Sequence, residues 1–106
     1  MTSLALLMTT VSSEADAETL SKGMLQARLA ACVTTIPGAQ SRYWWKDQLE
    51  SSTEWLLLIK TSPDRVDSLK RHLSEHHPYD TPELLEVPVT SAFTAYAAWV
   101  EKETRP

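Results

Sequence analysis

Hydrophobic and polar positions along the first part of the chain predict a strand followed by a helix. The strand is predicted over Leu4 to Val11, and Ser12 and Ser13 are suited to cap a helix that begins near Glu14 and runs to about Leu29. Acidic residues fall in the first turn of this helix, where the helix dipole favours negative charge. The stripe expected to face the core consists of Ala17, Leu20, Met24 and Ala27.

The middle of the chain predicts further strands. Ala31 to Ile36 is predicted as a buried strand, Pro37-Gly38 as a turn or bulge, and Ser41 to Lys46 as the continuation of that strand or its partner. We expect the polar segment Asp47 to Thr53 to reverse the chain. Trp55 to Lys60 (WLLLIK) is apolar at successive positions, which is typical of a central strand with apolar surroundings on both faces.

The last part of the chain predicts a helix, a strand and a final helix. Ser62-Pro63-Asp64 is a helix start with Ser62 as N-cap, and this helix should end near His76 because Pro78 disfavours helical geometry in the residue before it. Leu84 to Val89 is predicted as a strand, and Ser91 as the cap of the last helix. The core-facing positions of the two helices are Val66, Leu69 and Leu73, then Phe93, Tyr96, Ala97 and Val100.

This order of elements predicts an α+β fold, a ferredoxin-like βαββαβ sandwich with an added C-terminal helix. A length of 106 residues indicates one domain, residues 1–106. The helices of such a fold cover one face of the sheet, so large rings on or near the strands indicate an oligomer interface. The alternative is that these rings fill the core of the protomer itself. They are Tyr43, Trp44, Trp45 and Trp55.

Composition narrows the function classes. The chain is 42% hydrophobic and 23% charged, which is typical of a globular domain. A net charge of −4 without a Lys/Arg cluster argues against nucleic acid as a partner. We expect no signal peptide and no membrane span, and therefore a cytoplasmic protein. The single cysteine, Cys32, excludes an internal disulfide.

The stretch HHPYDTPE, residues 76–83, combines metal-ligating side chains with two prolines that stiffen the connection from helix to strand. The turn would carry Glu83 back toward His76, giving one nitrogen and one oxygen ligand for copper or zinc. The weaker candidates are His72, His77 and Cys32. His72 and His76 stand four residues apart, a spacing that is also common on ordinary helix surfaces, and a lone cysteine is more often a small buried hydrophobe.

Two ligands are too few for tight metal binding. A third would come from Cys32, from the first strand near Thr9, or from a neighbouring subunit. Catalytic motifs are missing from the sequence, since it has no Gly-rich phosphate loop, no GxSxG and no HExxH. We therefore predict a protein that is not an enzyme.

Three blocks of the sequence, LAACVTTIPGAQSRYWWKDQLE, WLLLIKT and HHPYDTPELLEVPVT, together span roughly residues 29 to 90. They resemble the CutA family of divalent-cation-tolerance proteins. The resemblance rests on the linked motifs LAAC, IPG, YWW, HPY and PE. It implies a ferredoxin-like protomer assembled into a tight homotrimer through strand pairing between sheets.

The resemblance also implies binding of copper or other divalent ions, with a histidine of HHPY and the glutamate of TPE as ligands. These map onto His76 and Glu83 here. Some family members add a cysteine on the first strand, and this chain has Thr9 at that position. Cys32 matches the cysteine of the family's LAAC block.

Two functions follow from the resemblance and the pattern together. The first is a trimeric protein that binds divalent cations, copper foremost and then zinc, in metal tolerance or response. The alternative is a trimeric scaffold or signalling module whose clefts between subunits bind a small molecule or a protein, with incidental metal binding. Neither function requires an organic cofactor.

Overall fold

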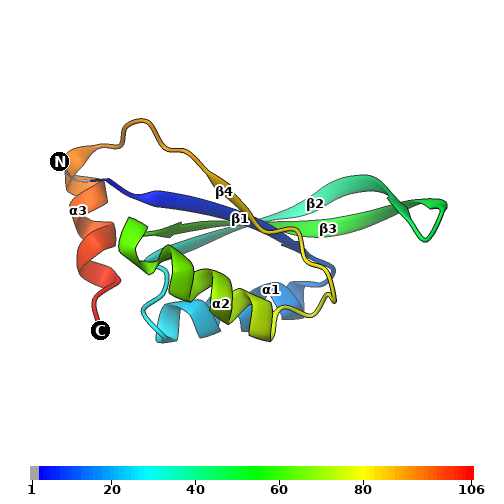
Figure 1. Ribbon diagram of the computed structural model, residues 1–106, viewed down its shortest axis with the longest axis horizontal. Helices are drawn as coiled ribbons and strands as arrows, with labels where there is room; N and C mark the ends of the chain where they lie inside the picture. The colour runs from blue at the N-terminus through cyan, green and yellow to red at the C-terminus, as the bar shows by residue number, and fades with distance from the viewer. Residues whose placement is uncertain (1–2) are drawn as a thin grey trace.

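The computed structural model describes residues 3–106 and confirms the predicted order of elements. Four strands, three α-helices and one short 3₁₀ helix follow each other along the chain (Figure 1). Their order is β-α-β-β-α-β with an added C-terminal helix. They are β1 (Ala5–Val11), α1 (Glu14–Gln26), β2 (Cys32–Trp45), β3 (Gln48–Thr61), η1 (Pro63–Arg65), α2 (Val66–His76), β4 (Leu85–Val87) and α3 (Thr94–Glu103).

The strands form one antiparallel sheet in the order β2-β3-β1-β4. Helices α1 and α2 lie side by side on one face of the sheet, and α3 lies at the end of the sheet where β1 begins (Figure 1). This confirms the prediction of an α+β fold with helices on one face. None of the helices in residues 3–106 is long and apolar enough to cross a membrane.

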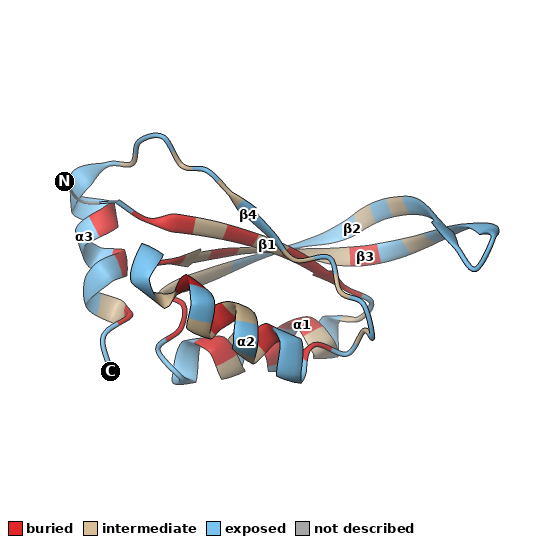
Figure 2. Cartoon of the chain, viewed as in Figure 1, coloured by how far each residue is buried: buried red, intermediate tan, exposed pale blue. Residues whose placement is uncertain are grey.

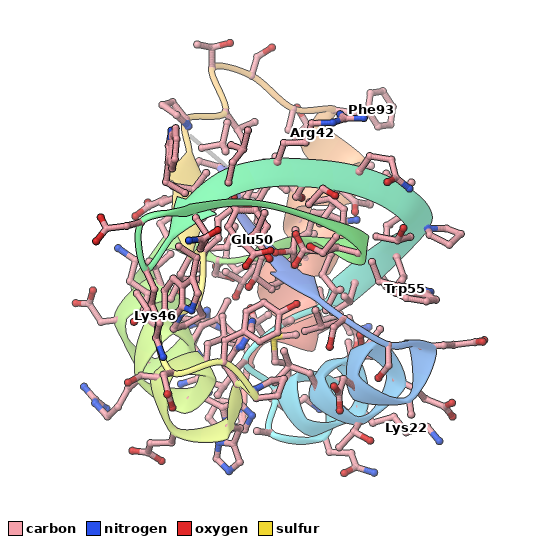
Figure 3. All side chains as sticks on the ribbon, turned by 90° about the vertical axis from the view of Figure 1, so that its right-hand side faces the viewer. Lys22, Arg42, Lys46, Glu50, Trp55 and Phe93 are labelled. Carbon is pink, nitrogen blue, oxygen red and sulfur yellow. The ribbon has the colours of Figure 1, made fainter. Side chains whose placement is uncertain are left out.

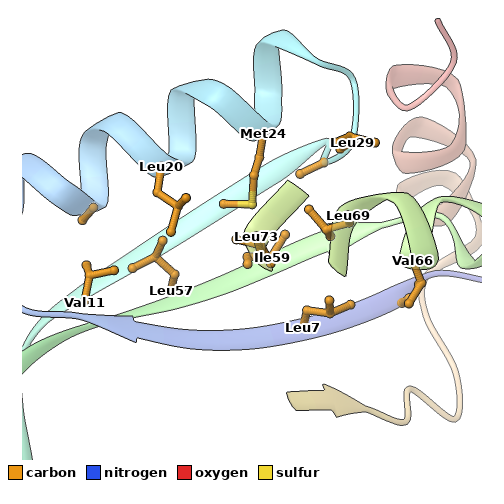
Figure 4. Close-up of a cluster of buried hydrophobic side chains, with 13 residues drawn as sticks. Leu7, Val11, Leu20, Met24, Leu29, Leu57, Ile59, Val66, Leu69 and Leu73 are labelled. Atoms are coloured by element: carbon orange, nitrogen blue, oxygen red, sulfur yellow. The ribbon is translucent and has the colours of Figure 1, made fainter. Parts of the chain in front are cut away.

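The core lies between the sheet and the helices α1 and α2. Alternate residues of β1 and β3, Leu7, Val11, Leu57 and Ile59, point to this layer and are fully buried. Side chains from α1 and α2 meet them there (Figure 4). They are Ala17, Leu20, Met24, Val66, Leu69 and Leu73, as the helical stripes predicted. The expectation that Ala27 also faces the core is wrong, because α1 ends at Gln26 and Ala27 is exposed.

The opposite face of the sheet is apolar and only partly covered. Leu6 and Met8 of β1 and Leu56 and Leu58 of β3 are half-buried, and Ile36 of β2 is exposed. The prediction that WLLLIK is apolar toward both faces is therefore confirmed, because Leu57 and Ile59 point to the helices and Leu56 and Leu58 to the other side. A monomer leaves this second face in water.

The hairpin of β2 and β3 extends beyond the rest of the sheet. Strand β1 ends opposite Trp55, so the pairs from Ala39–Glu54 to Trp45–Gln48 form a two-stranded arm, which we call the β2–β3 arm. The arm projects from the body and most of its residues are exposed (Figure 2). Its turn consists of Lys46 and Asp47, both with positive φ, which is the backbone of a tight hairpin turn.

Ser41 to Trp45 continues the strand of Cys32 to Ile36, and Pro37-Gly38 is a bulge within it, so one of the two alternatives is confirmed in each case. Two other expectations need correction. The segment Ala31 to Ile36 is not a buried strand, because its residues are half-buried or exposed. The expected reversal over Asp47 to Thr53 is wrong, because only Lys46 and Asp47 turn the chain and Gln48 onward is strand. The polar residues of this segment lie on an exposed ribbon, where polarity carries no information about turns.

Helix ends also differ from the prediction. Helix α1 ends at Gln26 rather than near Leu29 because Arg28 adopts φ 58°, and the N–H of Leu29 then bonds back to the carbonyl of Met24 at 3.0 Å. At the other end of α1, Ser13 caps the helix as predicted by accepting the N–H of Asp16 at 3.0 Å.

Ser62 occupies the predicted N-cap position, with Pro63 following it in the short 3₁₀ helix η1 that precedes α2. Its hydroxyl makes no cap hydrogen bond and bonds Thr104 at the end of α3 instead. The last helix begins at Thr94, with Phe93 at the cap position, so the expected cap by Ser91 is wrong. Of the expected core face of α3, Ala97 and Val100 are buried, whereas Phe93 and Tyr96 are exposed.

The strand expected over Leu84 to Val89 is shorter than predicted. Only Leu85–Val87 pairs with β1, opposite Leu6 to Met8. Pro88 follows directly and has no N–H to continue the ladder.

Candidate functional site

The turn after α2 is the stiff corner that its two prolines predict. Helix α2 ends at His76, and His77 has the extended geometry, φ −67° and ψ 136°, that a residue before proline prefers. The N–H of His77 still bonds the carbonyl of Leu73 at 2.8 Å. The chain therefore leaves the helix with its last backbone donor satisfied and crosses to β1 in a fixed direction.

His77 is buried and both of its ring nitrogens are hydrogen-bonded. Nδ1 accepts the backbone N–H of Tyr79 at 3.1 Å, so the ring proton resides on Nε2, which lies 3.0 Å from the carbonyl of Thr10 and 2.9 Å from Oγ1 of Thr9. Burial lowers the pKa of His77 below its ordinary value. A metal ion at His77 would have to displace one of these hydrogen bonds.

Thr9 joins His77 to the segment that carries Glu83. Its hydroxyl donates to the backbone carbonyl of Glu83 at 2.6 Å and therefore accepts from Nε2 of His77. The side chain of Glu83 itself is exposed. The structure thus brings Thr9, His77 and the Glu83 backbone together at one edge of the sheet.

His76 is exposed and, unlike His77, has only one of its two ring nitrogens hydrogen-bonded to the described part of the chain. Its Nδ1 donates to the carbonyl of His72, one helical turn earlier, at 2.8 Å. Nε2 then carries the lone pair, and no hydrogen bond within residues 3–106 involves it. A histidine that ligates a metal usually fixes its ring in this way, with the other nitrogen bonded to a carbonyl.

His72 stacks on His76, with ring centroids 4.1 Å apart and an interplanar angle of 21°. Imidazole lone pairs lie in the ring plane, so nearly parallel rings direct them side by side rather than toward one point. Burial, then the neighbouring His76, lowers the pKa of His72. For these two histidines to share an ion, one ring would have to rotate out of the stack.

His76 and Glu83 face two different cavities. His76 lines a cavity of about 470 Å³ between α1 and α2, together with His72 and Gly23, whereas Glu83 lines one of about 570 Å³ beside the β2–β3 arm. Within residues 3–106 no three His, Cys, Asp or Glu side chains gather as a metal cluster. The pairing of His76 and Glu83 around one ion therefore stays a prediction.

Cys32 lies far along the sheet from this turn. It begins β2 opposite Lys60, is half-buried, and its Sγ is 4.0 Å from Oγ1 of Thr34 on the same strand. Cys32 belongs to no group of three or more His, Cys, Asp and Glu side chains within residues 3–106. Its role as a ligand also stays a prediction.

A pair of residues at the base of the β2–β3 arm, Tyr79 and Glu54, was not predicted from the sequence. Tyr79 donates its O–H to Oε2 of Glu54 at 2.7 Å. Burial, and then this hydrogen bond, raise the pKa of Tyr79 to about 12. Burial would raise the pKa of Glu54, but hydrogen bonds from Ser41, Tyr79 and Thr10 lower it below its ordinary value. Their separation by 25 positions left no signal in the sequence.

The four rings predicted at an interface fall into two groups. Tyr43, Trp44 and Trp45 lie on the β2–β3 arm with exposed fractions of 41%, 73% and 48%. The alternative that they fill the core of their own protomer is therefore wrong for these three. Trp55 is half-buried and packs against the core under α1 and α2.

The sequence matches the model of one protein family, described as CutA1 divalent ion tolerance protein, over residues 5–103. A divalent-cation tolerance protein CutA of Pectobacterium atrosepticum is 41% identical over 99 residues, which cover 93% of this chain and 90% of that protein. The protein of the same name in Escherichia coli O139:H28 is 40% identical over 104 residues, covering 98% and 93%.

Solved structures share the fold over nearly the whole chain. The crystal structure of a divalent ion tolerance protein CutA1 from Ehrlichia chaffeensis has a TM-score of 0.95 at 31% identity and covers 100% of this chain and 99% of that one. The crystal structure of CutA from Xylella fastidiosa has a TM-score of 0.93 at 37% identity and covers 96% and 98%.

Proposed function

The chain belongs to the CutA1 divalent ion tolerance family, and on that premise we propose that it is a homotrimeric, non-enzymatic protein that binds divalent cations in metal tolerance. Copper is the preferred ion of this proposal and zinc the next, because nitrogen and oxygen ligands bind Cu²⁺ most tightly among the common divalent ions. A cytoplasmic location is part of the same proposal.

The ring of His76 is the single observation that best supports metal binding. Its Nδ1–H is bonded to the carbonyl of His72 at 2.8 Å, which holds the imidazole in the tautomer that leaves Nε2 free for an ion. Glu83 is the proposed oxygen ligand, and its carboxylate is exposed. One histidine and one carboxylate fit Cu²⁺ or Zn²⁺ chemically but are too few for tight binding, so we propose that a neighbouring subunit adds ligands.

Isothermal titration of copper(II) and zinc into the full chain tests this site. His76→Ala and Glu83→Gln should each weaken binding at least about tenfold, the loss expected when one of few ligands is removed. Glu86→Gln is the matched control, because Glu86 lies three residues beyond Glu83, is also exposed, and pairs with Lys70 at 3.2 Å. Equal binding by the parent and both ligand variants would refute the metal site.

The uncovered face of the sheet supports the trimer. Leu6, Met8, Leu56 and Leu58 are only half-buried there, and β2 is an edge strand with one side unpaired. Trp44, 73% exposed on the arm, adds a large apolar surface. Contiguous apolar surface and an open strand edge are both features that association covers.

The oligomer is tested by light scattering with two tryptophan variants. Trp44→Ala should reduce the mean particle mass at micromolar concentration and leave the helical content unchanged, because Trp44 contributes nothing to the protomer core. Trp55→Ala should instead lower the free energy of unfolding of the protomer, since Trp55 packs against that core. A parent protein with the mass of one chain would refute the trimer.

A second function is favoured by the cavity beside the arm. A trimeric scaffold or signalling module would need a pocket for its ligand, and the cavity of about 570 Å³ is within the usual size range of small-molecule sites. Metal binding would then be incidental.

A further inference from the structure

Aromatic and acidic side chains from two segments of the chain line the cavity beside the β2–β3 arm. The strand pairing puts Ala39 opposite Glu54, so Glu54 and every second residue along β2, which includes Ser41, Tyr43 and Trp45, point to the same face of the arm. The turn after α2 closes the other side with Tyr79, Asp80, Thr81 and Glu83.

A buried carboxylate forms the floor of this cavity. Glu54 is 6% exposed and takes the O–H of Tyr79 at 2.7 Å. Hydrogen bonds from neutral groups hold the pKa of Glu54 below its ordinary value, so the group is charged at pH 7. None of the ion pairs in the described part of the chain includes Glu54. Neutral donors thus keep Glu54 charged, and no cationic side chain among residues 3–106 pairs with it, so its negative charge is available to a cationic ligand.

Aromatic side chains also line this cavity. Tyr43, Trp45 and Tyr79 all line the cavity, and the face of such a ring attracts a cation. The chain already shows this attraction, because Nζ of Lys46 lies 6.0 Å from the centroid of the Trp45 ring. Aromatic rings next to a buried carboxylate are suited to bind an organic cation.

The charges of the residues that line the cavity also favour a cationic ligand. Asp80 and Glu83 add two carboxylates to that of Glu54, and Arg42 is the only cationic residue among those that line the cavity. Arg42 alternates with Tyr43 along the strand, so its side chain starts from the opposite face of the arm from Ser41 and Tyr43 (Figure 3). Even with the guanidinium counted, the three carboxylates leave the lining with a negative balance.

We propose that the cavity beside the β2–β3 arm binds a small organic cation, a primary ammonium on a short apolar chain. The ammonium donates to the carboxylate of Glu54, and the apolar part lies against the rings of Tyr43 and Trp45. This proposal gives a ligand class to the second of the two functions proposed above and uses neither His76 nor a metal ion.

An organic cation fits this space better than a bare divalent ion. The described side chains of His, Cys, Asp and Glu form no cluster of three that could surround an ion, although Glu54, Asp80 and Glu83 all line the cavity. Their carboxylates are spread around a volume of about 570 Å³, which a metal ion with its first ligands would leave mostly empty.

Binding is tested by NMR titration of the full chain at pH 7 with n-butylammonium, after treatment with EDTA. n-Butanol is the neutral probe of the same size. We expect saturable shifts of the Trp45 indole N–H and the Thr10 amide with n-butylammonium, and binding of n-butanol at least about tenfold weaker, since it lacks the charge that pairs with Glu54. Equal binding of the two probes, or no saturable shift with n-butylammonium, would overturn the proposal.

Variants assign the binding to Glu54. Glu54→Gln keeps the shape of the side chain and should weaken the binding of n-butylammonium at least about tenfold. Glu50→Gln is the control, because Glu50 lies on the same strand but outside the cavity lining, and it should leave this binding unchanged. Trp45→Leu, on the exposed arm, should weaken it severalfold without touching the carboxylate. Unchanged affinity in Glu54→Gln and Trp45→Leu would overturn the assignment.

The test separates this proposal from that of the metal site. Copper binding is measured on the same Glu54→Gln protein, and we expect it to equal that of the parent. Loss of copper binding in His76→Ala with intact n-butylammonium binding supports both proposals. Copper binding without n-butylammonium binding refutes only the cation cavity, and the reverse result refutes only the metal site.

Discussion

Tyr79 donates its phenolic O–H to Oε2 of Glu54 at 2.7 Å and thereby ties the turn after α2 to the base of the β2–β3 arm. The two residues come from segments 25 positions apart, so this bond fixes the position of one element relative to the other. It also supplies one of the neutral donors that keep Glu54 charged while it is buried.

Tyr79→Phe should therefore lower the free energy of unfolding by about 1–2 kcal/mol at pH 7, since it removes a hydrogen bond to a charged group. The pKa of Glu54 is lowered in the folded protein, so the stabilisation exists above the unfolded pKa of 4.5 and is lost as the pH falls through the folded pKa. Urea unfolding at fixed protein concentration should show a smaller difference between parent and variant at pH 3.

The control for this prediction is Tyr43→Phe. The O–H of Tyr43 reaches Oγ of Ser52 only at 3.4 Å in an exposed position, so its removal should change the free energy of unfolding by less than about 0.5 kcal/mol. A loss in Tyr79→Phe that is the same at pH 3 and pH 7 would contradict the role assigned to the ionised Glu54.

Acid should destabilise the protein through His77 before the carboxylates protonate. Burial lowers the pKa of His77 in the folded state, so the unfolded chain binds a proton near pH 6.5 that the folded chain still excludes. Stability is then constant above pH 6.5 and falls as the pH decreases from there toward the folded pKa. NMR titration of the His77 ring should give a pKa below 6.5, and a value above 6.5 would contradict the buried neutral ring.

His72 contributes to this pH dependence in the same direction, because its pKa is also lowered. The two contributions are separated with His77→Gln and His72→Gln, each of which should remove part of the loss of stability between pH 6.5 and pH 5.

Thr9→Cys should convert the edge of the sheet near His77 into a tighter site for soft metals. Oγ1 of Thr9 lies 2.9 Å from Nε2 of His77 and 2.6 Å from the carbonyl of Glu83, so a thiolate there would stand next to an imidazole and close to the Glu83 segment. We expect zinc and copper(I) to bind at least about tenfold tighter, or by about 1.4 kcal/mol, in anaerobic titrations. Thr9→Val is the control, since it removes the hydroxyl without adding a ligand.

The bulge in β2 should depend on Gly38. This residue has φ +79°, and a Cβ there would meet no atom within 4 Å, so the cost of Gly38→Ala is the backbone strain alone. Thermal unfolding should show a loss of about 1–2 kcal/mol. An equally stable variant would mean that the bulge has rearranged.

Gly23→Ala, at the other glycine of the chain, should stabilise the protein rather than destabilise it. Gly23 lies inside α1 with its Cβ position 3.4 Å from Nε2 of His72, which is an ordinary contact with a side chain that is only half-buried. The higher helix propensity of alanine should raise the free energy of unfolding by about 0.5 kcal/mol. A decrease would show that the His72–His76 stack cannot shift.

The helical part of the core was predictable because its residues repeat at short range. Leu69 and Leu73 stand one helical turn apart, so the buried side of α2 follows from local spacing. The end of α2 was predictable for the same reason, since Pro78 acts on its direct neighbour. The left-handed Arg28 that ends α1 carried no such signal, because arginine rarely adopts that geometry. WLLLIK is apolar at successive positions, and its pattern did not show that Leu57 and Ile59 are the residues that face the helices.

The candidate site was predictable only as a segment. HHPYDTPE marks the turn, but the partner of each histidine depends on where that turn lies against β1, which brings Thr9 and Thr10 to His77. The length of the β2–β3 arm was hidden by its polar residues, and without the arm there was no reason to place Glu54 beside Tyr79. Contacts between distant segments depend on register and bulge positions that local patterns do not encode.

The two-residue turn at Lys46 and Asp47 has a consequence for the order in which the protein assembles. β2 and β3 follow each other directly, so they can pair as soon as both have been synthesised, while the partner of β1 on its other side, β4, emerges only later. An early hairpin with open edges is prone to join a second hairpin. We expect the charged side chains of Lys46, Asp47 and Glu50 near its tip to oppose such pairing, because they would have to leave water, until α1 and α2 have covered their side of the sheet.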